Sequence, residues 1–294
     1  MTRRNIAAVP TAERPRSRFL IANRLTHHVL EWSDTGPPVL LLHGFLEHAH
    51  AWDFVAPRLA AAGLRPVAVD WRGHGESDWV GAGGYYHFAD YAADLAGLVR
   101  ALGGTAALVG HSMGANAALQ YAGTEPERVT RLVCVDALGP TDMGDDAAPR
   151  RFASWITQMD GLVRRGPRRT TLDDAARRLA ERFPRFPVAA ARHMAWHGTR
   201  PAGPYREWKF DPLHQTLSPY PYTTRRARAF WERVSCPVLY VEGGDTPFRL
   251  PEHELAERLT VLRAERHTMH ETGHHPHLER PEALADVLIR FLRR

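Results

Sequence analysis

Short runs of continuously apolar residues alternate along the chain with stretches whose apolar residues recur every three or four positions. Four of the short runs, VLLL, ALVG, LVCV and VLYV, are continuously apolar and contain no charged side chain. Strands of this kind are covered on both faces, which is typical of a mostly parallel sheet. The alternation predicts an α/β fold in which right-handed crossovers place helices on both sides of one sheet. The predicted strands are 18–22, 27–32, 39–42, 65–69, 106–109, 132–135, 238–241 and 263–269.

The helical periodicity divides the chain into a core and an insertion. Helices are predicted at 51–62, 88–102, 116–123, 251–262 and 281–292, whereas the first two strands have no helix between them and predict an antiparallel hairpin at one edge. From 139 to 233 no run indicates a strand, and helices are predicted at 149–164, 172–183 and 188–196. We therefore expect a disordered basic tail at 1–17, a core made of 18–138 and 234–294, and a helical cap at 139–233.

The sequence GHSMG at 110–114 follows one buried strand and precedes an alanine-rich helix. A serine between two glycines at such a junction is typical of a sharp strand-to-helix turn that exposes the hydroxyl. Glycine leaves room for this turn, because a Cβ at either position would collide with nearby backbone. We predict Ser112 as a nucleophile at the N-terminus of a helix, where free N–H groups face a developing negative charge.

A serine hydroxyl needs a base and an orienting acid to become a strong nucleophile. In sites of this type the acid and then the histidine follow the serine along the chain. Asp245 follows the predicted strand 238–241, and His274 follows the predicted strand 263–269. Both are thus expected at the carboxyl ends of strands, where open α/β sheets place their sites. Asp136, after the strand 132–135, is an alternative acid, and His275 is an alternative base.

Five segments, in their order along the chain, resemble the signatures of the α/β-hydrolase family. They are HGF at 43–45, DWRGHGES at 70–77, GHSMG at 110–114, GGD at 243–245 and GHHPHLERPE at 273–282. The resemblance extends from Leu40 to the C-terminus and is closest to the esterase, epoxide-hydrolase and haloperoxidase-like branch. It implies an α/β-hydrolase fold: a mostly parallel eight-stranded sheet flanked by helices, with a helical cap inserted.

The resemblance also implies roles for individual residues. Asp245 and His274 stand at the family's positions for the acid and the base, which favours them over the alternatives. The backbone N–H groups of Phe45 and Met113 are expected to form the oxyanion hole that stabilises a tetrahedral intermediate. Chemistry of this kind requires no cofactor.

The spacing of histidines and cysteines predicts neither a metal site nor a disulfide framework. There are 17 histidines, but their spacing matches neither the His-Glu-x-x-His motif nor a facial triad. There are two cysteines, which are too few for a framework of disulfides. No metal is therefore expected.

Composition narrows the classes of partner and compartment. The formal net charge is +5, but no nucleic-acid-binding motif accompanies it, so no nucleic acid is expected as a partner. No run approaches the roughly 18 apolar residues of a membrane helix, and the N-terminal stretch lacks the apolar run of a secretory signal. A cytoplasmic protein is expected, and the almost complete use of arginine over lysine favours a GC-rich bacterial source.

Aromatic residues and arginine pairs are frequent in the predicted cap. The aromatic residues either line a substrate pocket or pack the cap onto the core, and the pattern favours neither. The arginine pairs are interpreted as solvated helix faces, with an anionic substrate as the alternative. The aromatic residues are Trp155, Trp196, Trp208, Trp231, Tyr205, Tyr220 and Tyr222.

The predicted function is hydrolysis of a carboxylic ester, or a related acyl bond, of a small molecule through an acyl-enzyme. Because His274 must be neutral to act as a base, activity is expected to fall below about pH 6 to 7. Ser112 disfavours epoxide hydrolases and haloalkane dehalogenases, which carry aspartate at this position. The alternatives are a carbon–carbon bond hydrolase or a cofactor-free perhydrolase of the same fold, and a small-molecule receptor with a vestigial triad. The sequence does not predict the oligomeric state.

Overall fold

A computed structural model describes residues 14–163 and 169–294 of the chain. Its centre is an eight-stranded sheet with the order β1-β2-β4-β3-β5-β6-β10-β11. β1 and β2 pair antiparallel at one edge, β2 also pairs antiparallel with β4, and the other neighbours are parallel. The predicted α/β-hydrolase sheet and its edge hairpin are confirmed. The strands are β1 (Arg16–Ala22), β2 (Leu25–Glu31), β3 (Pro38–Leu42), β4 (Arg65–Val69), β5 (Ala106–His111), β6 (Val129–Val135), β10 (Val238–Gly243) and β11 (Glu265–Met269).

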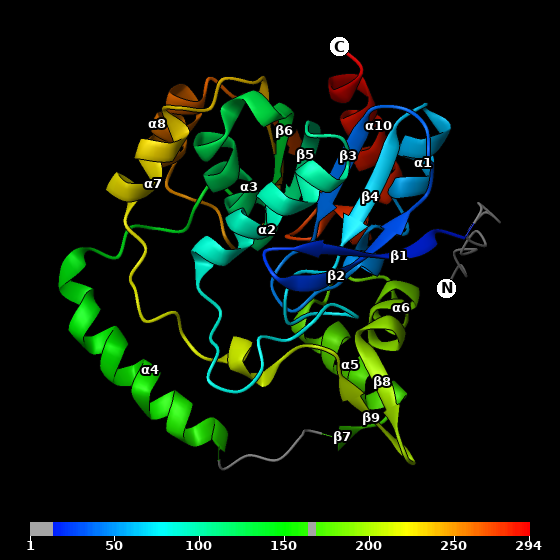
Figure 1. Cartoon of the computed structure of the whole chain (residues 1–294). Helices are drawn as coiled ribbons and strands as arrows, with labels where there is room; N and C mark the ends of the chain where they lie inside the picture. The colour runs from blue at the N-terminus through cyan, green and yellow to red at the C-terminus, as the bar shows by residue number, and fades with distance from the viewer. Residues whose placement is uncertain (1–13, 164–168) are drawn as a thin grey trace.

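Two separate layers of apolar side chains cover the faces of the sheet. Successive residues of a strand point to opposite faces, so Leu40 and Leu42 of β3 join one layer while Val39 and Leu41 join the other. The first layer packs under α2 (Phe88–Ala101), α3 (Met113–Thr124) and α8 (Glu252–Leu262). The second packs under α1 (Ala56–Ala61) and α10 (Pro281–Leu292). Figure 1 shows α2 and α3 on one side of the strands, with α1 and α10 on the other.

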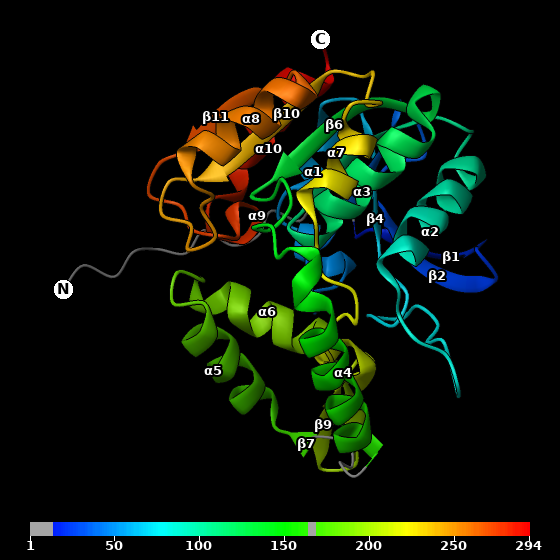
Figure 2. The ribbon, with the colours of Figure 1, turned by 90° about the vertical axis from the view of Figure 1, so that its left-hand side faces the viewer.

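Most of the predicted cap, which lies between β6 and β10 in the sequence, is found beyond the ends of the strands, in the lower half of Figure 2. It contains the predicted helices, but the expectation that it has no strand is wrong. Three short strands form a second, antiparallel sheet in the order β7-β9-β8. The backbone pairing of these strands does not require alternating apolar and polar residues, so the sequence pattern did not indicate them. The elements are α4 (Ala148–Val163), β7 (Arg169–Thr170), α5 (Leu172–Arg182), α6 (Val188–Gly198), β8 (Thr199–Ala202), β9 (Tyr205–Trp208), η4 (Pro212–Gln215) and α7 (Thr224–Trp231).

The last part of the predicted cap packs on the core. α7 lies against α3, and a Cβ on Gly123 of α3 would meet the carbonyl oxygen of Phe230 at 2.2 Å. Trp231 is buried in the apolar layer that α3 covers. Because Gly123 has no side chain, α7 can pack closely against α3 before the chain enters β10.

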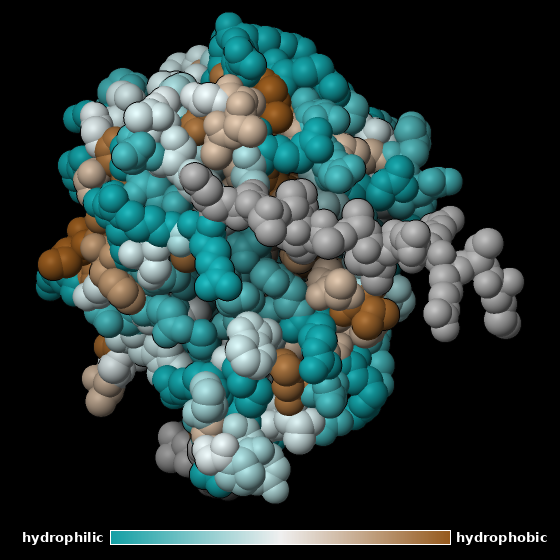
Figure 3. Space-filling model, turned by 90° about the vertical axis from the view of Figure 1, so that its right-hand side faces the viewer, coloured by the Kyte–Doolittle hydropathy of each residue, from teal (hydrophilic) through white to brown (hydrophobic). Residues whose placement is uncertain are grey.

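Two further expectations concern the chain's N-terminus and surface. Of the predicted tail 1–17, residues 1–13 lie outside the described residues, while Arg16 and Ser17 belong to β1. Among the described residues, no helix combines the length and apolar composition needed to cross a bilayer. The face drawn in Figure 3 is mostly hydrophilic, with small and separate hydrophobic patches.

Candidate active site

Ser112 occupies the turn between β5 and α3, and its backbone has a positive φ of 50° with a ψ of −112°. This conformation is unfavourable for a residue with a side chain. The flanking glycines make the turn possible: a Cβ on Gly110 would meet the amide nitrogen of Ala115 at 2.4 Å, and one on Gly114 would meet the carbonyl oxygen of Leu42 at 2.4 Å. The expected strand-to-helix turn is thus present, with its serine half-buried at the helix N-terminus.

The Ser112 hydroxyl contacts the imidazole expected from the sequence. Ser112 Oγ and His274 Nε2 lie 3.1 Å apart. On the other side of the ring, His274 Nδ1 donates to Asp136 Oδ2 at 2.6 Å. His274 comes from the loop after β11 and Asp136 from the end of β6, so three strand ends bring the groups together. The ring is thereby held with Nδ1 toward a carboxylate and Nε2 toward the hydroxyl.

Neighbouring groups fix the Asp136 carboxylate. Its Oδ1 accepts a hydrogen bond from the backbone N–H of Gly243 at 2.8 Å, and its Oδ2 accepts one from the Thr246 hydroxyl at 2.5 Å. The Asp136 backbone also has a positive φ of 53°, and its N–H donates to the carbonyl of Val241 at 2.7 Å. Each donor lies on or just after β10, so the strand beside β6 orients the acid that faces His274.

The sequence placed Asp245 in contact with His274, and the structure corrects this. The Asp245 side chain is 48% exposed and forms an ion pair with Arg185 of the cap at 2.5 Å. The backbone N–H of Asp245 donates to the carbonyl of Thr272. The GGD segment thus turns its carboxylate outward, and the alternative acid Asp136 takes the inward position.

A buried carboxylate that the sequence did not single out stands behind this set. Glu47 Oε1 lies 3.1 Å from His111 Nδ1, and His111 Nε2 donates to the backbone carbonyl of His274 at 2.7 Å. Burial alone would lower the pKa of His111, but the charge and hydrogen bond of Glu47 raise it above its usual value. His111 thus links the backbone of His274 to the Glu47 carboxylate. The sequence shows a glutamate three residues after Gly44, but it does not show that this residue contacts histidines that are remote in sequence.

The Glu47 carboxylate also contacts His275, the alternative base in the sequence prediction. His275 Nε2 lies 3.3 Å from Glu47 Oε1, and His277 Nε2 lies 3.4 Å from Glu47 Oε2. Burial lowers the pKa of His275 to about 3 and that of His277 to about 4. His275 therefore packs behind the site, between Glu47 and the rings of Phe183 and Phe186.

The two backbone groups expected to form an oxyanion hole lie on adjoining segments. Phe45 is the second residue of a turn closed by the bond from Glu47 N–H to Gly44 O at 3.3 Å, and Met113 is the first residue of α3. Leu42 pairs with Gly110 across β3 and β5, so the turn after β3 begins beside the turn that carries Ser112. This arrangement agrees with the expected role, which remains a prediction.

Metal-ligand atoms also gather at this site, but other partners surround them. Glu47, His111 and His277 form one such group, and His111, His274 and His275 form another, with ligand atoms within 4.8 Å of one another. Both nitrogens of His274 already face Asp136 and Ser112.

The environment of His274 predicts the acid limb of any reaction in which it acts as a base. Burial lowers the pKa of His274 below the usual 6.5, although the hydrogen bond from Nδ1 to Asp136 opposes the shift. The neutral ring therefore persists to lower pH than the sequence suggested. We expect the acidic limb of kcat/KM for a neutral substrate to have its midpoint below pH 6.5. A midpoint at or above 6.5 would contradict this assignment of the base.

Comparisons with known proteins agree with this geometry. The sequence profile of the family described as "alpha/beta hydrolase fold" matches residues 37–281. An esterase of Mycobacterium tuberculosis is 28% identical over 88% of this chain and 84% of its own length. The 2-(acetamidomethylene)succinate hydrolase of Mesorhizobium japonicum is 32% identical over 77% of each chain. Among solved structures, a hypothetical protein of Pseudomonas aeruginosa PAO1 has a TM-score of 0.87 at 30% identity, covering 95% of this chain and 99% of its own. The chain therefore belongs to the α/β-hydrolase family, whose fold and sheet order it has.

Proposed function

We propose that the protein is a serine hydrolase that cleaves a carboxylic ester, or a related acyl bond, of a small molecule. Ser112 Oγ attacks the carbonyl carbon while His274 Nε2 takes the hydroxyl proton, and Asp136 stabilises the imidazolium that results. His274 then gives this proton to the leaving alcohol, which departs and leaves an acyl group on Ser112. Water, deprotonated by the same ring, hydrolyses the acyl-enzyme and restores the serine.

The contacts from Ser112 through His274 to Asp136 are the observation that carries this proposal. A neutral serine is a weak nucleophile, and a chain of a hydroxyl, an imidazole and a buried carboxylate is the usual way to activate it. Chemistry that uses an aspartate nucleophile would need aspartate at position 112, where this chain has a serine in the strained turn. The names of relatives, an esterase and an amide-containing diacid hydrolase, agree with attack on a carbonyl.

The oxyanion that forms during attack needs donors that are already in place. We assign this role to the backbone N–H groups of Phe45 and Met113, the first from the turn after β3 and the second from the first turn of α3. Within 14–163 and 169–294, neither N–H donates to a protein acceptor, so both are available to a ligand. Each such donor contributes about 3 kcal/mol of transition-state stabilisation in sites of this kind.

A fluorophosphonate probe tests the proposal directly, because it reacts only with an activated serine. We expect one adduct per chain, located on Ser112 by peptide mass, and no adduct in Ser112→Ala. Ser77, a buried serine in the loop after β4, provides the matched control: Ser77→Ala should still be labelled if it folds. Labelling at another serine, or none with the folded protein, would reject the proposal.

Substrate class is tested by turnover of a panel of nitrophenyl esters of increasing acyl length, together with thioesters and a vinylogous diketone. Multiple turnover of esters, lost in Ser112→Ala, is the expected outcome. Preference for the diketone would favour carbon–carbon bond hydrolysis instead. Labelling followed by a single turnover and tight retention of the product would favour a receptor.

A further inference from the structure

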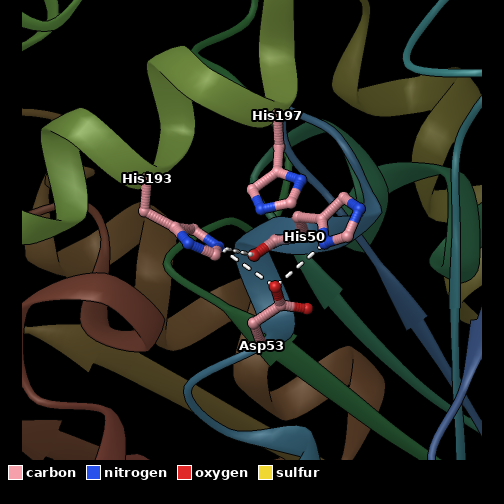
Figure 4. Close-up of side chains that lie close together, drawn as sticks. All are labelled: His50, Asp53, His193 and His197. Carbon is pink, nitrogen blue, oxygen red and sulfur yellow. Dashed lines mark hydrogen bonds and ion pairs between the residues drawn. The ribbon is translucent and has the colours of Figure 1, made fainter. Parts of the chain in front are cut away.

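A second group of histidines lies between the core and the cap, away from Ser112. His50 lies in η1 (Ala49–Trp52), and Asp53 is the residue that follows η1. His193 and His197 lie on α6 of the cap. The α6 pair is four residues apart and so shares one face of the helix. Figure 4 shows the two α6 rings pointing toward the two core side chains. Segments that are far apart in sequence thus bring three imidazoles and one carboxylate together.

The four side chains are close enough to share one ligand. Asp53 Oδ2 lies 2.9 Å from His50 Nδ1 and 3.1 Å from His193 Nε2. The rings of His50 and His197 stack with centroids 3.7 Å apart, and those of His193 and His197 are 4.6 Å apart. One ligand atom from each residue lies within 4.8 Å of every other. This is a convergent donor set, and not a row of unrelated surface groups.

We propose that His50, Asp53, His193 and His197 form a binding site for a divalent transition-metal ion of the zinc type. Three imidazole nitrogens and one carboxylate oxygen are a ligand set that Zn²⁺ takes in tetrahedral sites. Bonds of about 2.0–2.1 Å place tetrahedral ligand atoms about 3.3 Å apart. The pairs at 2.9 and 3.1 Å must therefore open slightly, and more distant pairs, which lie within 4.8 Å, must close by rotation of side chains. The side chains of His50, Asp53 and His193 are 20–23% exposed, which leaves an entry path for the ion.

Three imidazoles converge on the single carboxylate of Asp53. A neutral imidazole is the form that binds an ion. Three rings placed around one carboxylate also have more donor capacity than that carboxylate can satisfy.

The ion would join the cap to the segment that carries the proposed oxyanion donor. The chain runs from Phe45 through Glu47 and His48 to His50, and His48 Nε2 already contacts the carbonyl of Met194 on α6 at 3.0 Å. His193 Nε2 similarly lies 3.1 Å from the carbonyl of His50. Metal binding would add a bridge at this junction and hold α6 against η1. The proposed role is thus structural, and it does not depend on the chemistry at Ser112.

Competition with a colorimetric zinc indicator tests the site, using the full chain purified without a histidine tag. We expect one Zn²⁺ per chain with a Kd of about 1 µM or lower. The double variant His193→Gln/His197→Gln should weaken binding at least about 100-fold. His87→Gln and His253→Gln, which remove exposed histidines elsewhere, should bind as the wild type does. Asp53→Asn is a second test that leaves the imidazoles in place and should also weaken binding.

Thermal unfolding gives an independent measurement. Zn²⁺ in excess should raise the Tm of the wild type by several degrees, since a ligand that binds only the folded state stabilises it. The double variant loses the contacts of His193 to Asp53 and to the carbonyl of His50, so its Tm in EDTA is its own reference, and Zn²⁺ should not raise it. Two results would overturn the proposal: no binding by the wild type at about 100 µM Zn²⁺, or binding that survives in the double variant and is lost in His274→Ala.

Discussion

Asp136→Asn should lower kcat about 10³- to 10⁴-fold while leaving the fold intact. An asparagine would present an NH₂ group to His274 Nδ1, and the ring would then carry its proton on Nε2. That nitrogen could no longer accept the proton of Ser112. Asparagine is the suitable replacement because Asp136 has a φ of 53°, a conformation that asparagine tolerates better than most residues. The amide oxygen can still accept the bond from Gly243.

Asp245→Asn is the matched control, since it makes the same chemical change just after β10, the strand beside β6. Asp245 pairs with Arg185 at the surface, where an ion pair contributes little, so kcat should change less than about threefold. The measurement is steady-state hydrolysis of the best ester from the panel, with unfolding followed in parallel. A larger loss in Asp245→Asn than in Asp136→Asn would restore the acid that the sequence favoured and refute the role proposed for Asp136.

The second large effect concerns stability: the fold should weaken markedly between pH 7.5 and 5.5. Burial lowers the pKa of His48, His214 and His275 to about 3 and that of His277 to about 4. Below 6.5 the unfolded chain binds protons at these residues and the folded chain does not, so stability is present above pH 6.5 and lost as the pH falls. Four such groups cost at most about 5 kcal/mol by pH 5.5. His111, whose folded pKa is raised, has the opposite sign and offsets part of the loss.

A loss of this size is comparable to the whole stability of many domains. We therefore expect Tm to fall by roughly 10 °C or more between pH 7.5 and 5.5 at constant ionic strength. In His48→Gln the amide can still donate to the carbonyl of Met194. This variant should reduce the number of protons taken up on unfolding by up to one, and so weaken the dependence of Tm on pH. His87→Gln at the surface should not change this dependence. A Tm that stays constant within about 3 °C over this range would contradict the prediction.

The parts of the fold that the sequence predicted are those with a strong local pattern. The strand 65–69 and the helix 281–292 have the predicted bounds, because apolar runs and a proline at the first helical turn mark them. β7, β8 and β9 were missed, because strands of two to four residues are too short for a periodic signal. α7 was missed because it carries a single buried residue, Trp231, among arginines.

The candidate acid shows why a site is harder to predict than a strand. β6 and β10 are neighbours and Val135 pairs with Val241, so Asp136 and Asp245 both follow strand ends at the same edge of the sheet. Which carboxylate turns inward depends on backbone angles and on donors from Gly243 and Thr246, and sequence order does not contain these. The group of His50, Asp53, His193 and His197 could not be predicted for a similar reason, since 143 positions separate His50 from His193.

The positive φ of Ser112 has a consequence for how such a chain can evolve. Holding a side chain in this sparsely populated conformation costs about 1–3 kcal/mol, a penalty that glycine would avoid. Selection for thermostability alone would therefore favour glycine at this position, and only a demand for its hydroxyl retains the serine. A descendant freed from that demand should lose the hydroxyl early while its sheet and helices persist.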